Sequence, residues 1–180
     1  HCQSNNWNVT GVEVNDSANQ LAKEKIGGSI FNDINDIDKA DQFDIITLWH
    51  VLEHIHDLNK VFKKLKTKLS KSGHLIIALP NHESLDQKIY KEHWAAYDVP
   101  RHLYHFNPLT FNKLASEMDM KVVSIIPMKF DSFYVSLLSE KYKTGTTSYI
   151  KSFINGWKSN RWALKNGNNY SSLIYILKQK

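Results

Sequence analysis

The residues best suited to chemistry stand together in the short segment HVLEH, where His50, Glu53 and His54 follow an apolar run. Imidazole and carboxylate groups exchange protons and bind metals near neutral pH. The spacing H-x-x-E-H also fits a zinc peptidase pattern, which needs both histidines on one helical face and a carboxylate ligand downstream. His50 instead falls at the exit of a predicted strand. We therefore interpret these residues as the wall of a pocket and predict no metal ion.

The segment lies inside a predicted strand–helix–strand unit. Phe43–Trp49 and His74–Leu79 are apolar runs, and between them apolar residues recur at helical spacing from Leu58 to Leu69. Ser72-Gly73 is expected to end that helix. Two buried strands joined in this way form a right-handed parallel pair, whose chemistry lies just past the carboxyl ends of the strands. Those ends are Trp49–His56 and Pro80–Ser84.

Strands and helices alternate along most of the rest of the chain. This alternation predicts the α/β class with a mainly parallel sheet, and the short return before the last strand favours antiparallel pairing there. The expected strands are Trp7–Val14, Ser29–Phe31, Lys121–Pro127 and Ser171–Lys178, and the expected helices are Ser17–Lys25, Leu85–Ala96, Thr110–Met118, Phe133–Tyr142 and Tyr149–Leu164. The first of these helices is expected to have Asn15, Asp16 or Ser17 as its cap and Gly27-Gly28 as its stop. Leu85–Ala96 is expected to be a helix or a broken helix, and Thr110 is the expected cap of the helix that follows.

Composition limits the classes of protein that the chain can represent. The 180 residues fit one domain, and 42% hydrophobic with 23% charged residues fits a globular protein. We find no apolar run of membrane-spanning length, roughly 20 residues. The lone Cys2 excludes an internal disulfide and leads us to expect a cytoplasmic protein. The net charge of +5 is explained by solvated helix faces, so nucleic acid is not indicated, and the sequence leaves oligomerisation open.

Two acidic residues follow predicted strands in the first part of the chain. Glu13 ends the first strand, where a carboxylate of a nucleotide-binding sheet accepts hydrogen bonds from both ribose hydroxyls. Asp33 follows the next strand, where a carboxylate accepts from the exocyclic amine of adenine. The alternatives are a helix cap for Glu13 and an Asx turn for Asp33.

With these residues in place, the sequence resembles the class I S-adenosylmethionine (SAM)-dependent methyltransferases. It is most similar to the branch of ubiquinone-type O-methyltransferases and related bacterial proteins. The resemblance is carried by three segments in the expected order, WNVTGVEVNDSANQLA, FDIITLWHVLEHIHDLNKVFKKLKTKLSKSGHLIIALPN and VPRHLYHFNPLTFNKLASEMDMKVVSI. It implies a Rossmann-like fold and SAM as cofactor. The cofactor-binding residues that it implies are Glu13 and Val14 at the ribose, Asp33 and Ile34 at the adenine, and Trp49 and His50 beside the methionine part.

One departure from the family is large. The family has a glycine-rich loop after its first strand, and none of the seven glycines here forms a G-x-G. We therefore expect residues 1–180 to be one partial methyltransferase domain, truncated at its N-terminus, in which the first strand and the glycine-rich loop are missing.

The aromatic loop around YDVPRHLYHFN is expected to cover the methyl acceptor. His102 stands in the PRH piece of the resemblance and is predicted to be catalytic, removing a proton from the acceptor. The alternative is a packed loop of hydrogen-bonded histidines. The predicted substrate-binding residues are His54, Trp94, Tyr97 and His105.

The predicted function is methyl transfer from SAM to an unidentified small-molecule or macromolecular acceptor. One alternative is a metal-assisted O-methyltransferase acting on RNA or a catechol-like hydroxyl. This alternative arises because some relatives carry E-x-x-E-H at this place and bind a divalent ion; here His50 replaces the first glutamate, and Mg²⁺ prefers oxygen ligands. The other alternative is a catalytically inactive domain that serves in binding.

Overall fold

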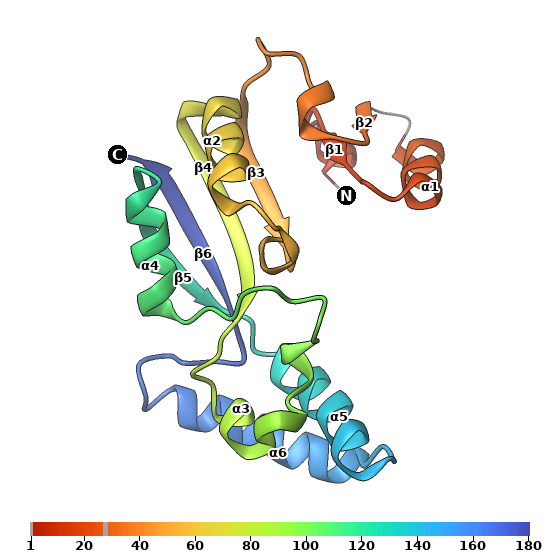
Figure 1. Cartoon of the computed structure of the whole chain (residues 1–180), viewed down its shortest axis with the longest axis vertical. Coiled ribbons are helices and arrows are strands. Elements are labelled where there is room, and N and C mark those ends of the chain that lie inside the picture. Colours follow the sequence, from red (N-terminus) through yellow and green to blue (C-terminus); the bar gives the residue numbers. More distant parts are fainter. Residues whose placement is uncertain (1, 27–28) are drawn as a thin grey trace. The chain divides into compact units, whose positions relative to one another are not determined.

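The computed structural model describes residues 2–26 and 29–180. The chain divides into two compact units, His1–Gln42 and Phe43–Lys180. Figure 1 shows the elements of both along the chain. Among the described residues, no helix combines the length and apolar character needed to cross a membrane.

The first unit is built on two short parallel strands. Thr10 pairs with Ser29 and Val12 with Phe31. Of the three predicted caps of the helix between the strands, Asn15 is the one observed, because its Oδ1 accepts from the Ala18 N–H at 3.0 Å. The predicted glycine stop of that helix, at positions 27 and 28, lies outside the described residues. The elements are the 3₁₀ turn η1 (Gln3–Asn5), β1 (Thr10–Val12), α1 (Asp16–Ile26), β2 (Ser29–Phe31) and the 3₁₀ turn η2 (Ile34–Asp36).

The second unit contains a four-stranded mixed sheet in the order β3-β4-β6-β5. β3 and β4 are parallel, and β6 runs antiparallel to both β4 and β5. The prediction of an antiparallel closing strand is therefore confirmed. The prediction of a mainly parallel sheet is not met here, because the closing strand lies between β4 and β5 and makes two of the three described pairings of this sheet antiparallel. The strands are β3 (Phe43–Trp49), β4 (Leu69–Pro80), β5 (Met120–Pro127) and β6 (Ser172–Gln179).

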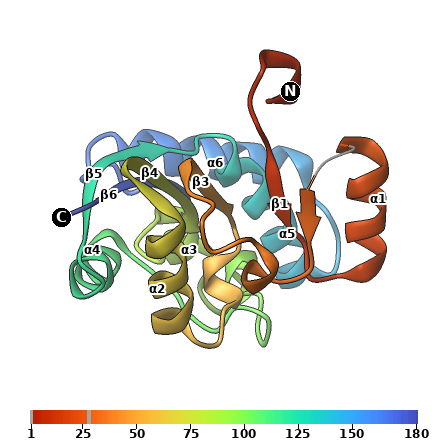
Figure 2. The same ribbon diagram turned by 90° about the horizontal axis from the view of Figure 1, so that it is seen from above.

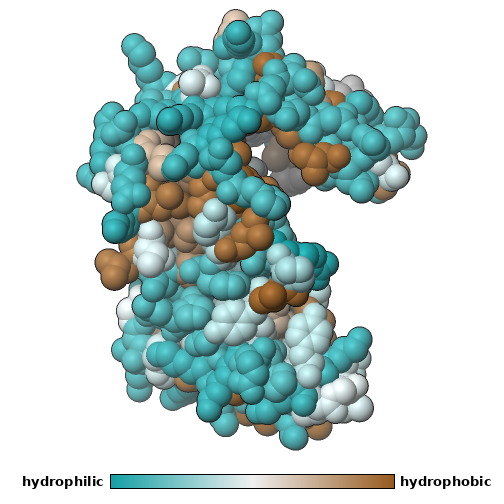
Figure 3. All heavy atoms as spheres, in the orientation of Figure 1, coloured by the Kyte–Doolittle hydropathy of each residue, from teal (hydrophilic) through white to brown (hydrophobic). Residues whose placement is uncertain are grey.

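Helices of the second unit occupy two places around its sheet. α2 and α4 lie on one face, whereas α3, α5 and α6 gather beyond the carboxyl ends of β3 and β4 (Figures 1 and 2). Figure 3 shows hydrophobic residues over the strands beside α2 and α4, whose outer surfaces are hydrophilic. The elements are η3 (Leu52–His54), α2 (Leu58–Lys68), α3 (Leu85–Tyr90), η4 (Lys91–His93), η5 (Ala95–Tyr97), α4 (Pro108–Glu117), α5 (Asp131–Thr144) and α6 (Tyr149–Ala163).

The boundary between α2 and β4 differs from the prediction. α2 ends at Lys68 and β4 begins at Leu69, so Ser72-Gly73 lies inside the strand rather than ending the helix. The pairing with β3 shifts register there. A Cβ on Gly73 would lie 2.8 Å from Leu69 Cδ1 and 3.0 Å from the Phe43 carbonyl oxygen. The glycine thus permits a close approach within an irregular strand pair, which is a second common use of glycine.

The structure shows the form of the Leu85–Ala96 helix and the residue that caps α4. The segment Leu85–Ala96 is a broken helix, as one of the predicted options stated, and Lys91 interrupts it with a positive φ of 50°. The cap of α4 is Asn107, not Thr110. Asn107 Oδ1 accepts from the Thr110 N–H at 2.8 Å, and Thr110 Oγ1 accepts from the Asn107 N–H at 3.0 Å, so the two form a reciprocal capping box.

A buried carboxylate joins the elements beyond the strand ends. Asp86 of α3 is 0% exposed. Its Oδ2 accepts from Trp94 Nε1 at 2.8 Å and from Ser171 Oγ at 2.7 Å. Its Oδ1 accepts from Ser159 Oγ of α6 at 2.6 Å. Since an unpartnered buried carboxylate is costly, these donors hold α3, α6 and the start of β6 together.

α5 and α6 approach each other closely at Gly156. A Cβ at this position would lie 2.9 Å from Phe133 Cα and 3.0 Å from Phe133 N. Glycine is therefore required where the backbone of one helix meets the other. The rings of Phe133 and Phe153 stack beside this contact, with centroids 5.3 Å apart.

We predict that Asp86→Ala lowers the free energy of unfolding by about 3 kcal/mol or more, because three buried donors lose their acceptor. Urea denaturation followed by circular dichroism measures the change. Asp44→Ala is the matched control: Asp44 is exposed on β3 and accepts one bond, from Ser70 Oγ at 3.1 Å. It should change the free energy by about 0.5 kcal/mol or less. Equal effects of the two substitutions would contradict the role given to Asp86.

Candidate functional site

The exit of β3 places His50 in a strained conformation. His50 has a φ of 51°, in the left-handed region that few residues other than glycine adopt and in which asparagine, aspartate and histidine are the most frequent of those few. Its N–H donates to the Ala78 carbonyl at 3.1 Å, which continues the pairing of β3 with β4. Trp49, the last residue of the strand, is 51% exposed. Strained residues of this kind recur at functional sites.

His50 lies between two carboxylates. Its Nδ1 is 3.4 Å from Glu53 Oε1, and its Nε2 is 3.2 Å from Asp131 Oδ2 at the start of α5. The hydrogen bond with Asp131, followed by that with Glu53, raises the pKa of His50 from 6.5 to about 9, against the opposing effect of burial. His50 is therefore a cation at neutral pH and links the exit of β3 to α5.

Glu53 is the most deeply enclosed acid of this site, at 0% exposure. Among the described residues, neither of its carboxylate oxygens has a hydrogen bond of good geometry. The nearest nitrogens are His50 Nδ1 at 3.4 Å and His102 Nε2 at 3.9 Å from Oε1. A buried carboxylate is costly without close donors or cations. The His50 imidazolium 3.4 Å away offsets part of this cost, and the remaining lone pairs of Glu53 can accept a further proton donor or cation that enters the site.

His54 and His102 are oriented by backbone carbonyls. His54 Nδ1 is 3.0 Å from the Arg101 oxygen, and His102 Nδ1 is 2.8 Å from the Ala96 oxygen. A carbonyl can only accept, so Nδ1 carries the proton in both bonds, and the neutral ring keeps its lone pair on Nε2. The two rings meet edge to face with centroids 4.6 Å apart. One ligand atom each from Glu53, His54 and His102 lie within 4.8 Å of one another.

The aromatic loop packs Tyr97 against a second set of rings. Its hydroxyl accepts from Gln87 Nε2 at 2.8 Å and lies 3.1 Å from His82 Nε2. The rings of Tyr97 and His105 meet edge to face with centroids 5.0 Å apart. Burial, with smaller contributions from His102 and His82, lowers the pKa of His105 from its ordinary value. His105 is thus suited to contact a ligand as a neutral ring.

The remaining predicted substrate residue, Trp94, lies in the core. It is 2% exposed, its Nε1 is bonded to Asp86, and its ring supports that of Tyr97 with centroids 5.2 Å apart. The second unit therefore brings His50, His54, Tyr97, His102 and His105 to one region, with Trp94 as their support.

The first unit holds the predicted adenosine residues at the ends of its strands. Glu13 is partly exposed, and its Oε1 accepts from the Asn15 N–H at 2.8 Å. Asp33 Oδ1 accepts from the Asn35 N–H at 2.7 Å and caps η2, which is the turn geometry of the alternative interpretation. Val14 is 80% exposed, and Ile34 is half-buried. A carboxylate offers about four lone-pair sites, so these local bonds leave room for a ligand.

Asp131 is the residue that the sequence analysis missed. It was placed before the predicted start of its helix, at Phe133, whereas α5 begins at Asp131 itself. An acidic residue in the first turn of a helix is common for electrostatic reasons alone. Nothing in the local sequence connects it with His50.

The comparisons with known proteins agree with this architecture. A family model described as "Methyltransferase domain" matches residues 1–125. The chain therefore belongs to this family of methyltransferase domains. No curated protein sequence matches the chain.

Solved structures share the fold. A SAM-dependent methyltransferase from Archaeoglobus fulgidus has 17% identity and a TM-score of 0.60, with 99% of this chain and 79% of that chain covered. Coclaurine N-methyltransferase, bound to N-methylheliamine and SAH, has 16% identity and a TM-score of 0.58, with 98% of this chain covered. The chain spans 62% of the length of that enzyme. The plantazolicin methyltransferase BpumL has 14% identity and a TM-score of 0.59, with 99% and 70% covered. The fold is thus that of the class I SAM-dependent methyltransferases.

We predict that Asp131→Asn moves the titration midpoint of His50 down from about 9 toward its ordinary 6.5. Because the folded pKa lies above the unfolded one, the ion pair stabilises the fold fully below pH 6.5 and loses its effect as the pH rises through about 9. Nuclear magnetic resonance titration of the imidazole measures the midpoint. Thermal unfolding of wild type and variant should differ most below pH 6.5 and converge above pH 9. Asp44→Asn should leave both measurements unchanged, and a constant difference across the pH range would refute the assignment.

Proposed function

We propose that the protein transfers a methyl group from SAM to an acceptor. The observation that carries the proposal is the match to the methyltransferase-domain family over residues 1–125, which include the acidic strand ends, the β3 exit and the aromatic loop. It is supported by relatives of the same fold whose structures contain SAH, such as coclaurine N-methyltransferase.

The strand ends of the first unit fit the adenosine part of SAM. Glu13 retains capacity to accept from the ribose hydroxyls, with Val14 beside it, although Oε1 already accepts from the Asn15 N–H. Asp33 and Ile34 are the proposed contacts of the adenine. The bonds of Asp33 to the Asn35 N–H at 2.7 Å and to Asn35 Nδ2 at 2.6 Å fix the direction of that carboxylate.

The exit of β3 fits the methionine part of the cofactor. Trp49 offers an exposed ring surface, and the backbone of His50 is held in place by its bond to Ala78. The imidazolium of His50 is neutralised by Glu53 and Asp131, so it serves to position the strand exit rather than to exchange protons.

SAM supplies a sulfonium methyl group, which the acceptor attacks in line. The work of the protein is therefore alignment and the exclusion of water. We assign proton removal to His102, because its Nδ1 is held by the Ala96 carbonyl and its Nε2 keeps a lone pair. His54, Tyr97 and His105 line the same region and are the proposed acceptor contacts, above the supporting ring of Trp94.

The edge of β3 away from β4 fits a further strand. In the described part of the chain, β3 pairs with β4 alone, and Ile45 and Trp49 on one face of β3 are 38% and 51% exposed. We propose that the complete methyltransferase domain, to which residues 1–180 contribute, has a further strand beside β3 and a glycine-rich loop after that strand.

We predict that the protein in its natural length binds S-adenosylhomocysteine and that Glu13→Ala weakens binding by about 10-fold to 100-fold, since two hydrogen bonds to a charged group are lost. Isothermal titration calorimetry measures both affinities. Glu24→Ala, an exposed glutamate on α1, is the matched control and should bind as wild type does. Unchanged affinity in Glu13→Ala would remove the ribose assignment. No binding by the wild type would favour the catalytically inactive binding domain instead.

A second candidate function is supported by the arrangement of Glu53, His54 and His102. The buried carboxylate of Glu53, paired with His50 at 3.4 Å, lies 3.9 Å from His102 Nε2, and His54 and His102 each donate the Nδ1–H to a backbone carbonyl. Metal-bound histidines typically donate the N–H of their second ring nitrogen in the same way. A divalent ion there would orient an acceptor hydroxyl of RNA or a catechol-like compound, as in a metal-assisted O-methyltransferase. The mixed nitrogen and oxygen set suits Mn²⁺ or Zn²⁺ better than Mg²⁺.

Metal titration distinguishes the two candidate functions. In the metal-assisted case, calorimetry should show one Mn²⁺ or Zn²⁺ per chain, and His102→Ala should weaken binding by at least about tenfold. His93→Ala, a partly exposed histidine beside Glu92, is the control. If His102 acts as a base without metal, no binding is expected, and His102→Gln lowers kcat by about 100-fold or more at unchanged cofactor affinity. Insensitivity of methyl transfer to a chelator would then exclude the metal-assisted reaction.

A further inference from the structure

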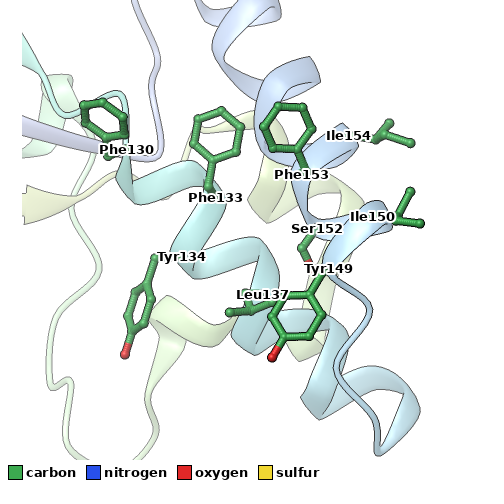
Figure 4. Close-up of a pocket in the computed structure, with 9 residues that line it drawn as sticks. All are labelled: Phe130, Phe133, Tyr134, Leu137, Tyr149, Ile150, Ser152, Phe153 and Ile154. Atoms are coloured by element: carbon green, nitrogen blue, oxygen red, sulfur yellow. The ribbon is translucent and has the colours of Figure 1, made fainter.

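α5 and α6 carry a large exposed apolar surface. A cavity of about 740 Å³ opens between them, and its lining is almost entirely hydrophobic or aromatic. Figure 4 shows the rings of Phe130, Phe133 and Phe153 on one side, and Tyr134 and Tyr149 on the other. Phe130 is 86% exposed and Tyr149 is 74% exposed. A surface of this kind on a protein marks a site of interaction.

In α6 the small side chains face the protein and large apolar side chains face outward, which is the opposite of what is expected for a helix in water. Its buried residues are the small ones, Ser152, Gly156, Ser159 and Ala163. Its exposed residues include large apolar ones, Ile150 at 76%, Phe153 at 63% and Trp157 at 49%, together with basic ones. A helix in water buries its apolar face, so the outer face of α6 is built for an apolar environment.

The charges around this surface are almost all positive. Residues 129–165 contain seven Lys or Arg and two Asp or Glu, an excess that equals the +5 net charge of the whole chain. All seven basic side chains are exposed. Of the two acids, Asp131 contacts His50 and Glu140 is 5% exposed. The solvent-facing charge of this helical hairpin is therefore cationic.

The lysines of α6 and of the turn after it recur with the same spacing as exposed apolar residues. Lys151, Lys158 and Lys165 each follow an exposed apolar residue of α6 or the turn after it, and all are spaced by seven. Residues seven apart share one face of a helix, so a row of lysines flanks a row of apolar side chains. Helices that lie in the interface of an anionic bilayer have this pattern, with lysines reaching the headgroups and aromatic rings below them.

We propose that the α5–α6 surface docks on an anionic lipid bilayer. The aliphatic side chains of Leu137, Ile150 and Ile154 in the cavity lining match acyl chains rather than nucleic-acid bases. The lysines supply attraction to phosphate headgroups, worth about fivefold in affinity for each residue near the surface. Docking is peripheral, since no described helix is fit to cross a membrane.

Vesicle co-sedimentation of the protein in its natural length tests the proposal. Binding to phosphatidylcholine vesicles that contain phosphatidylglycerol is expected, with little binding to phosphatidylcholine alone and a decrease at high salt. Trp157 should show a blue shift of fluorescence that Trp157→Phe removes. The double variant Lys151→Glu/Lys158→Glu should lower the partition coefficient by at least about twentyfold. Lys60→Glu/Lys63→Glu makes the same charge change on the exposed surface of α2 and should bind almost as wild type does.

The apolar contribution is tested separately. Ile150→Ser/Phe153→Ser should reduce binding, whereas Leu109→Ser, at a 78% exposed position on α4, should not. Circular dichroism shows whether each variant is folded. Equal losses in the α2 and α6 charge variants would overturn the proposal. So would binding of single-stranded RNA but not vesicles, or a dimer that the α6 variants dissociate in the absence of binding to lipid.

Discussion

The region beyond the carboxyl ends of β3 and β4 depends on the hydrogen bonds of one buried carboxylate, that of Asp86. One carboxylate with no exposure accepts from an indole and two hydroxyls that come from separate parts of the chain. The bond to Trp94 connects Asp86 with the candidate site. The indole of Trp94 packs against Tyr97, and the ring of Tyr97 packs against His105. Hydrogen bonds to a charged group in a low-dielectric interior are strong and directional. The site is therefore positioned by a buried anion that has no part in the chemistry.

Patterns of apolar residues predicted most of the fold. The strands Phe43–Trp49 and Ser29–Phe31 were placed with their observed bounds, because each is a short apolar run between polar residues. Ser72-Gly73 was misplaced because glycine both ends helices and permits close contacts inside strands. Only the neighbouring Phe43 backbone decides between these uses, and a local pattern does not contain it.

The candidate site was predictable to the extent that it depends on strand ends. Ligand-binding residues of an α/β fold follow the carboxyl ends of its strands, so Glu13 and His50 could each be singled out from their place after a strand. The pairing of His50 with Asp131 could not, since α5 reaches the β3 exit only through the packing of the whole second unit. The same holds for the carbonyls that orient His54 and His102. Polar contacts between distant segments follow from tertiary geometry rather than from spacing.

Gly156 has a consequence for the relation between the hairpin and the site. A Cβ there would lie 2.9 Å from the Cα of Phe133, two residues beyond Asp131, so only glycine allows the two backbones to come this close. A larger residue at this position would force α5 and α6 apart. Asp131 opens α5 and pairs with His50, so the helix that packs against α6 at Gly156 also carries one partner of the His50 ion pair.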